Sequence, residues 1–270
     1  MKIVSSGRGL YSQEFYKKKK KRRKILFIFV FIGIILLFSL CVYISRYKKF
    51  QINEVAVLGE NIIDREEMVL TTEQLLKGKY LWIFPKSNAF IYPRIAIREA
   101  LLEKFPRLKS VALHLNGLDK LSITIEERIP FALYCADDLT CYLLDNDGFI
   151  FDQALSFSRN LFFIYQTGDI IENPLGNRFL TSAEFKSLSI FIKNLATLNV
   201  YPVSFKVEGD KYVLSLSNDG KILWRKESDL ALIRSNLEAF LSSSSIRSEK
   251  NFLDRIEYLD LTIENKVFYK

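Results

Sequence analysis

The sequence predicts an α+β protein in which one N-terminal transmembrane helix precedes a folded region of strands and helices. Residues 25–44 contain no charged residue, and as a helix they are long enough to cross the hydrocarbon core of a bilayer. Beyond them, apolar residues recur with period 2 in some segments and with helical spacing in others. Hydrophobic residues make up 49% of the chain, with only 11 Gly and 6 Pro, a composition typical of globular rather than disordered proteins.

The apolar segment is predicted to be an uncleaved anchor over residues 25–45. A signal peptide has a shorter apolar region, of about 7–15 residues, followed by small residues at the cleavage site. Here the apolar run ends in Val42-Tyr43-Ile44-Ser45, where bulky side chains occupy the positions that a peptidase needs small. A buried core helix would show one polar face, and this segment has none. We therefore expect it to remain in the membrane.

Charge predicts the orientation of this anchor. Residues 1–24 carry ten Lys or Arg and one acidic residue, a net charge of +9, which leaves −1 of the chain's total of +8 for residues 25–270. The positive-inside rule then places residues 1–24 in the cytoplasm, as a basic tail, and residues 46–270 beyond the membrane. The basic run Lys17–Lys24 is interpreted as a topology signal that also contacts anionic lipid headgroups. Nucleic-acid binding is not expected, because the exported part is almost neutral.

The first part beyond the anchor, residues 50–127, predicts a small module of strand, helix, helix, strand and strand. Gly59 ends the first strand, and Asp64-Arg65-Glu66-Glu67 forms a capping box that starts the first helix. Asn116-Gly117 separates the last two strands. The expected elements are a strand Phe50–Leu58, helices Arg65–Leu76 and Arg94–Lys104, and strands Lys109–Leu115 and Leu121–Glu127.

Residues 128–270 predict a mostly antiparallel β-domain with flanking helices. Thr181-Ser182-Ala183-Glu184 is a second capping box, which starts a helix ending near Asn199. Another helix is expected over Ser228–Leu241, followed by a loop at Ser242–Ser245. The expected strands are Phe131–Cys135, Cys141–Leu144, Phe149–Phe151, Val203–Val207, Lys211–Leu216, Ile222–Trp224, Arg255–Ile263 and Lys266–Tyr269.

Residues suited to catalysis or to metal binding are scarce. The single histidine, His114, falls in an expected strand and is interpreted as a structural or surface residue. Asp145-Asn146-Asp147-Gly148 resembles a calcium loop but lacks the later bidentate Glu, so a turn is expected. Glu126 and Glu127 are adjacent on a strand and face opposite sides, so they do not form an acid–base pair. We therefore predict no enzymatic activity, no metal, no cofactor and no small-molecule substrate.

Five stretches carry a resemblance to a known family. They are FQINEVAVLG from Phe50, FPRLKSVAL from Phe105, IEERIPFALYC from Ile125, LLDNDGFIF from Leu143 and IEYLDLTIENKVFYK from Ile256. In this order, behind a basic tail and a single anchor, they resemble the FtsQ/DivIB family of bacterial cell-division proteins. The resemblance covers almost the whole chain. It implies a POTRA-like domain over residues 50–127 and an FtsQ/DivIB-type β-domain over 128–270.

The sequence departs from the family pattern at three places. Gly59-Glu60-Asn61 stands where the family has Gly-Asn, and residues 117–120 lack the customary proline of the hairpin. Asp260-Leu261-Thr262 replaces the closing Asp-Leu-Arg. The first two departures reshape turns, whereas the last puts in doubt any partner contact that depends on the arginine.

The resemblance implies a non-catalytic scaffold at the division septum, anchored in the inner membrane. Outside that membrane it would bind FtsB/DivIC-like and FtsL-like bitopic proteins and so recruit and regulate septal peptidoglycan synthesis. Two other classes stay open at this point. One is a POTRA-containing component of an outer-membrane assembly or secretion system, and the other is a membrane-anchored cell-wall enzyme.

The closing segment is the expected partner site. Ile256, Tyr258, Asp260 and Thr262 alternate with Leu259, Leu261 and Ile263. The chain stops so soon afterwards that nothing downstream is expected to cover this strand, which leaves an earlier strand as the alternative cover. In the family a partner strand adds here, which implies that the binding residues are Tyr258, Leu259, Asp260, Leu261, Thr262, Lys266, Val267 and Phe268. The alternative is that Tyr258 and Phe268 only pack the β-domain.

The cysteines leave a second question open. Cys135 and Cys141 flank a five-residue loop, and in a hairpin their Cα atoms would lie about 4.5–5.5 Å apart, within disulfide range. Either they form a disulfide or they are two half-buried thiols. Cys41 falls within the lipid span, where it acts as a small apolar residue.

Overall fold

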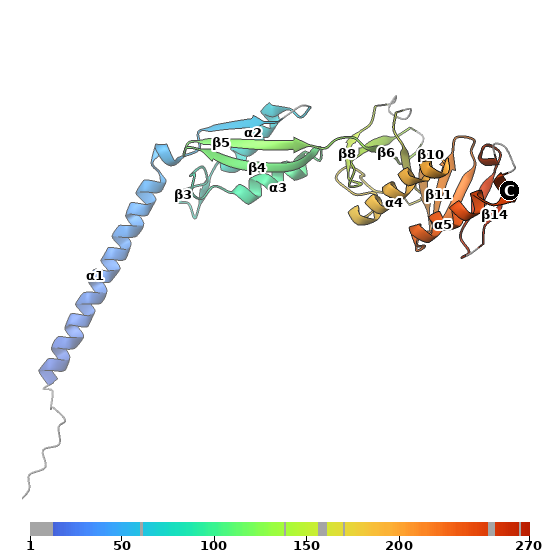
Figure 1. The fold of residues 1–270 in the computed structure, drawn as a ribbon. Helices are drawn as coiled ribbons and strands as arrows, with labels where there is room; N and C mark the ends of the chain where they lie inside the picture. Colours follow the sequence, from blue (N-terminus) through green and yellow to red (C-terminus); the bar gives the residue numbers. More distant parts are fainter. Residues whose placement is uncertain are drawn as a thin grey trace, which may run out of the picture. The chain divides into compact units, whose positions relative to one another are not determined.

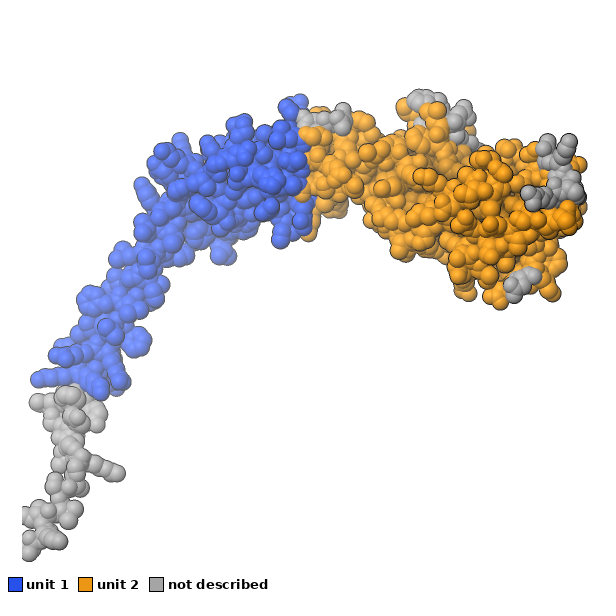
Figure 2. Space-filling model, viewed as in Figure 1, with its two compact units in different colours: residues 1–58, 65–98, 112–124 blue, residues 59–64, 99–111, 125–270 orange. Residues whose placement is uncertain are grey.

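The protein's computed structural model describes residues 13–59, 62–137, 139–155, 161–169, 171–247, 252–264 and 266–270 (Figure 1). The expectations for residues 1–12 of the basic tail, for Glu60 and Asn61, and for Asp138 lie outside these ranges. The architecture is mixed α+β, with one N-terminal apolar helix and a large domain that is mostly sheet. By its internal contacts the chain forms two compact units, 1–58 with 65–98 and 112–124, and 59–64 with 99–111 and 125–270 (Figure 2).

Helix α1 extends over Gln13–Ser45 and so begins before the expected apolar segment. Within Lys17–Ser45, the most apolar stretch of 18 residues has a mean hydropathy of 3.3, and none of these residues is buried inside the protein. Of the described helices, α1 alone is long and apolar enough to cross a membrane. The 3₁₀ turn η1 (Lys48–Phe50) follows it.

A small sheet has the strand order β1 (Glu54–Leu58), β5 (Lys120–Glu127) and β4 (Leu108–Asn116). β1 runs parallel to β5, with Val57 opposite Ile123, and both side chains are buried. Helices α2 (Arg65–Leu76) and α3 (Arg94–Lys104) have the predicted bounds. β1 begins later than expected, because the Ile52 N–H donates to the Ser87 carbonyl (2.8 Å) rather than to a sheet neighbour.

Gly59 ends β1 for a steric reason. Its φ is +92°, a conformation that side chains with a Cβ rarely adopt, and a Cβ at this position would lie 2.5 Å from the Ile125 carbonyl oxygen. A short hairpin, which the sequence did not predict, follows α2. It pairs β2 (Lys79–Tyr80) with β3 (Phe84–Pro85).

In the described chain, nine strands form the large sheet, in the order β14-β13-β12-β11-β10-β9-β6-β7-β8. The pairs β6·β9, β9·β10 and β12·β13 are parallel and the others are antiparallel, so the sheet is mostly antiparallel as expected. β9 was not predicted. The strands are β6 (Ala132–Cys135), β7 (Cys141–Leu144), β8 (Ile150–Gln153), β9 (Ile164–Thr167), β10 (Pro202–Glu208), β11 (Lys211–Leu216), β12 (Lys221–Arg225), β13 (Tyr258–Asp260) and β14 (Phe268–Tyr269).

Helices α4 (Ser182–Asn194) and α5 (Leu230–Leu241) lie on the same face of this sheet (Figure 1). The Thr181 hydroxyl accepts the Glu184 N–H, which confirms the predicted capping box. α4 continues as a 3₁₀ helix, η3 (Leu195–Leu198). The predicted loop at the serines is partly wrong, because Ser244–Arg247 forms α6; a 3₁₀ turn, η4 (Phe252–Asp254), precedes β13.

The core of the large domain lies between the sheet and these helices. Apolar side chains of α4 and α5 pack against aromatic residues of the central strands, and the packed aromatic rings provide much of the buried apolar area. Its largest fully buried members are Trp224, Tyr134, Tyr165, Phe185 and Phe205. Ile222 and Trp224 of β12 and Leu259 of β13 belong to this core, which therefore holds in place the strands at the β14 end of the sheet.

Candidate functional site

The closing segment forms the last two strands of the large sheet. β13 pairs in parallel with β12, with Ile222 opposite Leu259, and antiparallel with β14, with Asp260 opposite Phe268. The expectation that nothing downstream covers β13 is therefore wrong. The chain turns back near Ile263, whose carbonyl accepts the Lys266 N–H (3.2 Å), and its last residues lie against β13. Among the described strands, none lies beyond β14, so β14 forms the open edge at this end of the sheet.

Hydrogen bonding determines which backbone groups of β14 face outward. The Lys270 N–H donates to the Tyr258 carbonyl (3.2 Å), and the Tyr258 N–H donates to the Lys270 carbonyl (3.4 Å). In an antiparallel ladder such hydrogen-bonded pairs alternate with non-hydrogen-bonded pairs. Leu259 and Tyr269 form the next, non-hydrogen-bonded pair. The N–H and C=O of Tyr269 therefore point away from β13, toward the open edge.

The side chains of β14 divide between the two faces of the sheet. Tyr269 shares a face with the buried Leu259, and its ring centroid lies 5.3 Å from that of Phe240 and 5.6 Å from that of Phe252. Phe268 lies on the opposite face, beside Asp260, and is 48% exposed. Tyr269 is itself 51% exposed, but it makes the ring contacts with the domain that the sequence left open for Phe268.

The structure brings most of the predicted site residues together. Tyr258 and Asp260 lie half-buried on one face, and Leu259 and Leu261 are buried on the other, as the alternation predicted. Thr262 is half-buried after β13, and its N–H donates to the Asp260 carboxylate (2.8 Å). The remaining predicted residues are Lys266, which is exposed, Val267, which packs against the core, and Phe268.

Two residues of the predicted alternation are misplaced. Ile256 was expected on the face of Tyr258, but it is buried in the core, because regular strand begins only at Tyr258. Ile263 was expected on the buried face with Leu259, yet it is 47% exposed, since the strand ends at Asp260 and the chain turns.

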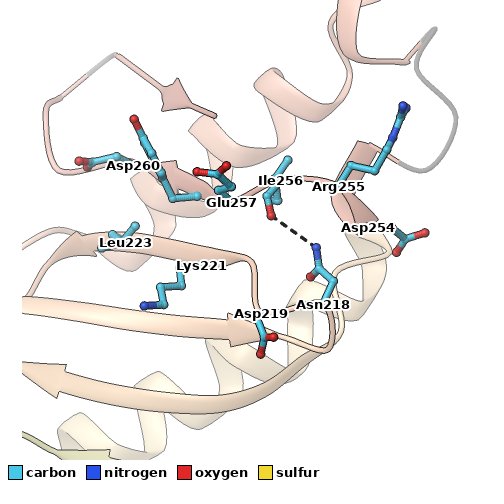
Figure 3. Close-up of a pocket in the computed structure, with 10 residues that line it drawn as sticks. Asn218, Asp219, Lys221, Leu223, Asp254, Arg255, Ile256, Glu257 and Asp260 are labelled. Carbon is cyan, nitrogen blue, oxygen red and sulfur yellow. Dashed lines mark hydrogen bonds between the residues drawn. The ribbon is translucent and has the colours of Figure 1, made fainter.

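A hollow of about 660 Å³ lies beside β13 (Figure 3). Residues of the β11–β12 turn and of β12 form one wall, and the segment that leads into β13 forms the other. The Asn218 amide joins the walls by donating to the carbonyls of Leu253 (3.1 Å) and Ile256 (3.4 Å). The charged and polar side chains around the hollow include Asp219, Lys221, Asp254, Arg255, Glu257 and Asp260.

The sequence had marked residues 218–220 as a turn, but it gave no sign that this turn lies next to the last strands. Lys221 and Leu223 were missed for the same reason. They are brought to the site by the parallel pairing of β12 with β13, in which Lys221 lies opposite Tyr258 and Leu223 opposite Asp260. Tyr269 and Lys270 were also left out of the predicted partner site. Their place in and directly after the expected strand Lys266–Tyr269, which contains two aromatic residues, could have indicated them.

Charge on this surface is mixed in sign. The Lys270 ammonium lies 2.8 Å from the Glu257 carboxylate, and their hydrogen bond raises the pKa of Lys270. Both side chains are exposed, so this ion pair positions the chain end without adding much stability. An edge with outward backbone groups, an exposed aromatic ring and a polar hollow is suited to binding another polypeptide segment.

The residues weighed for catalysis lie elsewhere. His114 is exposed on β4, and Glu126 binds Lys109 and Ser110 while Glu127 binds Arg107. Asp145 accepts the N–H groups of Asp147 and Phe149, so the stretch considered as a calcium loop is a turn. In the described part of the chain, no group of three or more His, Cys, Asp or Glu side chains is placed to hold a metal ion.

Cys135 and Cys141 form a disulfide. They lie opposite each other in the β6–β7 hairpin, with their Cα atoms 4.1 Å apart, and both are buried. The Asp137 carboxylate accepts the N–H groups of Leu139 and Thr140 within the loop that the bond closes. Leu139, at the tip of this loop, is 96% exposed.

Thiol labelling of the full chain checks this bond. The protein, denatured without reduction, is expected to react with maleimide only at Cys41, because the other two sulfur atoms are joined. After reduction all 3 cysteines are expected to react. Mass spectrometry of the labelled peptides gives the count, and three labels before reduction would show that the bond is not formed.

Comparison with models of known protein families and with curated proteins finds no match for this chain.

Proposed function

We propose that this protein is a non-catalytic, single-pass scaffold of the bacterial division machinery. The observation that carries the proposal is the open edge at β14, where the exposed ring of Phe268 lies opposite Asp260, a residue that lines the hollow along β13. This edge belongs to a large sheet domain on a chain that also contains a helix long enough to span a membrane. Such a domain acts by binding other proteins and holding them at one place on the membrane.

The proposed partners are FtsB/DivIC-like and FtsL-like bitopic proteins, bound outside the inner membrane at the septum. A partner strand would lie beside β14 and pair with the outward N–H and C=O of Tyr269. Side chains on alternate positions of that strand would contact Phe268, and the polar hollow beside Tyr258 would accept others. Main-chain pairing supplies affinity in this binding mode, and the side-chain contacts supply selectivity.

Charge substitutions at Tyr258 and Phe268 test the proposal. They are expected to abolish partner binding and to leave the melting temperature unchanged.

The two other classes of protein considered from the sequence predict different results. A component of an outer-membrane assembly system would bind a β-barrel protein instead, and a cell-wall enzyme would release fragments from purified peptidoglycan.

The proposal includes an orientation, with the N-terminus in the cytoplasm. The basic run Lys17–Lys24 forms part of α1 before its apolar stretch, whereas only Arg46, Lys48 and Lys49 follow shortly after it. Moving ten positive charges across the bilayer would be far less favourable than retaining them.

Alkaline phosphatase fusions check this orientation, because the enzyme is active only outside the cytoplasm. A fusion at the N-terminus is expected to be inactive, and a fusion after Lys49 is expected to be active. The matched control replaces Lys17–Lys21 by Gln, which should reduce the activity of the second fusion by weakening the topology signal. Reversed activities of the two fusions would contradict the proposed topology.

A further inference from the structure

The turn of the β2–β3 hairpin exposes a Leu and a Trp side chain. Leu81 and Trp82 are 81% and 92% exposed, and the chain turns through them with φ of +47° and +65°. The Ile83 N–H closes the turn by donating to the Tyr80 carbonyl (3.0 Å). Asn and Gly are the usual residues in such a turn, because a larger side chain is strained there. A strained turn that presents a large ring to its surroundings indicates a functional contact for that ring.

Several hydrogen bonds join this hairpin region to the end of α1. The buried Asn88 amide donates to the Ser45 carbonyl (3.0 Å), and the Ala89 N–H donates to the Phe50 carbonyl (2.9 Å). The Arg46 guanidinium donates to the Ile83 carbonyl (3.3 and 3.4 Å). The hairpin is therefore attached to the residues with which the chain leaves its apolar helix.

One contact lies within the apolar stretch itself. The ring of Phe84 packs edge-on against Phe38 of α1, with their centroids 6.1 Å apart. Phe38 precedes Ile44, the last residue of the uncharged run, by six residues, which corresponds to about 9 Å along a helix axis. Phe84, which pairs with Tyr80 next to the turn of the hairpin, thus contacts α1 near the outer end of the proposed membrane span.

The residues around the hairpin are of the types found where protein meets lipid headgroups. Tyr43, Tyr47 and Phe90 are 73%, 50% and 68% exposed. Segments 43–52 and 77–93 together contain six Lys or Arg and no acidic residue. Trp and Tyr are enriched at membrane–water interfaces, and basic side chains are attracted to anionic headgroups.

We propose that the tip Leu81-Trp82 inserts into the lipid leaflet from which α1 emerges and forms a second membrane contact of the protein. This inference rests on the proposed anchoring by α1, and it adds a lipid-binding surface to the scaffold. Lipid covers the two exposed side chains, and the lysines on either side bind headgroups. Two attachment points restrict rotation of the small module about the end of α1, which limits the directions in which the rest of the chain extends.

The two tryptophans of the chain allow a direct test. Trp224 is fully buried in the large domain, whereas Trp82 is exposed. The Trp224→Phe variant of the full chain therefore reports on Trp82, and the Trp82→Phe variant reports on Trp224 as the matched control. Each is reconstituted into vesicles of phosphatidylcholine and phosphatidylglycerol, with or without bromine atoms on the acyl chains.

Because an interfacial apolar residue lies about 5–10 Å into the headgroup–acyl boundary, brominated lipid is expected to reduce Trp82 emission about twofold. Trp224 emission should not change. The Trp224→Phe substitution alters the core, so a second comparison keeps Trp224 in place. The emission lost to brominated lipid in the wild type, minus the emission lost in Trp82→Phe, also measures quenching of Trp82.

Flotation of the vesicles separates failure of the anchor from failure of the hairpin contact. Protein that does not float with the vesicles would overturn the membrane anchoring and, with it, the hairpin contact. Protein that floats while Trp82 is quenched by aqueous iodide but not by brominated lipid would overturn the hairpin contact alone. Shielding of Trp82 that requires an added partner protein, without quenching by brominated lipid, would also overturn it and would identify a protein-binding surface.

Discussion

Replacing Tyr258 and Phe268 by Glu is expected to abolish binding of the FtsB/DivIC-like partner while the ectodomain keeps its melting temperature. Aromatic residues at the centre of an interface are worth about 2 kcal/mol or more each, and 2 kcal/mol corresponds to about a 30-fold loss of affinity. Phe268 is about half-exposed and lies on the face opposite the core, so a charge there removes little internal packing. Titration with the purified partner ectodomain, beside thermal unfolding of each variant, measures both effects.

Two control variants separate binding from folding. Tyr269→Ala removes a ring that packs against Phe240 and Phe252, so it is expected to lower the melting temperature, which Phe268→Glu should not do. Leu139→Glu places a charge at a highly exposed loop tip and is expected to change neither stability nor partner binding. A stable Tyr258→Glu/Phe268→Glu protein that binds the partner with undiminished affinity would show that the site lies elsewhere.

Local signals in the sequence predicted the helices of this protein well. α2 and α3 have the predicted bounds, and the Thr181 cap was recognised, because caps and apolar periodicity are properties of neighbouring residues. β11 was equally readable, since residues 211–216 are mostly apolar and are followed by the turn at 218–220. These elements depend on interactions within a few residues of the chain.

The elements that were missed depend on residues far away in the sequence. β9 is a four-residue strand whose partners β6 and β10 lie on both sides of it in parallel, and no local turn marks such a pairing. The return of β14 onto β13 is likewise a matter of pairing, because the same residues could have remained an extended tail. The hairpin at Leu81-Trp82 was not recognised because its turn lacks the Gly or Asn that such a turn normally contains.

A buried ion pair was also beyond what the sequence could predict. The Arg128 guanidinium binds the Asp145 carboxylate, and the two side chains are only 12% and 3% exposed. Arg128 also donates to the Pro106 carbonyl (3.2 Å) and lies over the ring of Phe149, 3.9 Å from its centroid. The sequence showed Asp145 only as part of a turn. Nothing local indicates that a cation seventeen positions earlier neutralises it.

Replacing Arg128 by Met is therefore expected to cost about 3–5 kcal/mol of unfolding free energy, because it leaves a buried carboxylate without its cation. The N–H groups of Asp147 and Phe149 still bind Asp145 in this variant, but they carry no net positive charge to offset its burial. Since domains are typically stable by about 5–15 kcal/mol, the loss should be large in urea-induced unfolding of the ectodomain. Its expected signature is a lower midpoint with an unchanged slope.

The matched control is Lys109→Met, which removes a cation from an ion pair with Glu126. Those side chains are 44% and 57% exposed, so water replaces the lost partner and the midpoint is expected to stay where it is. The double variant Arg128→Met/Asp145→Asn leaves no uncompensated charge and should recover part of the loss, since Asn can still accept the two N–H groups of the turn. If Arg128→Met were as harmless as Lys109→Met, the pair would contribute no net stability, and the turn at residues 145–148 would keep its shape through the bonds that the Asp145 carboxylate accepts from Asp147 and Phe149.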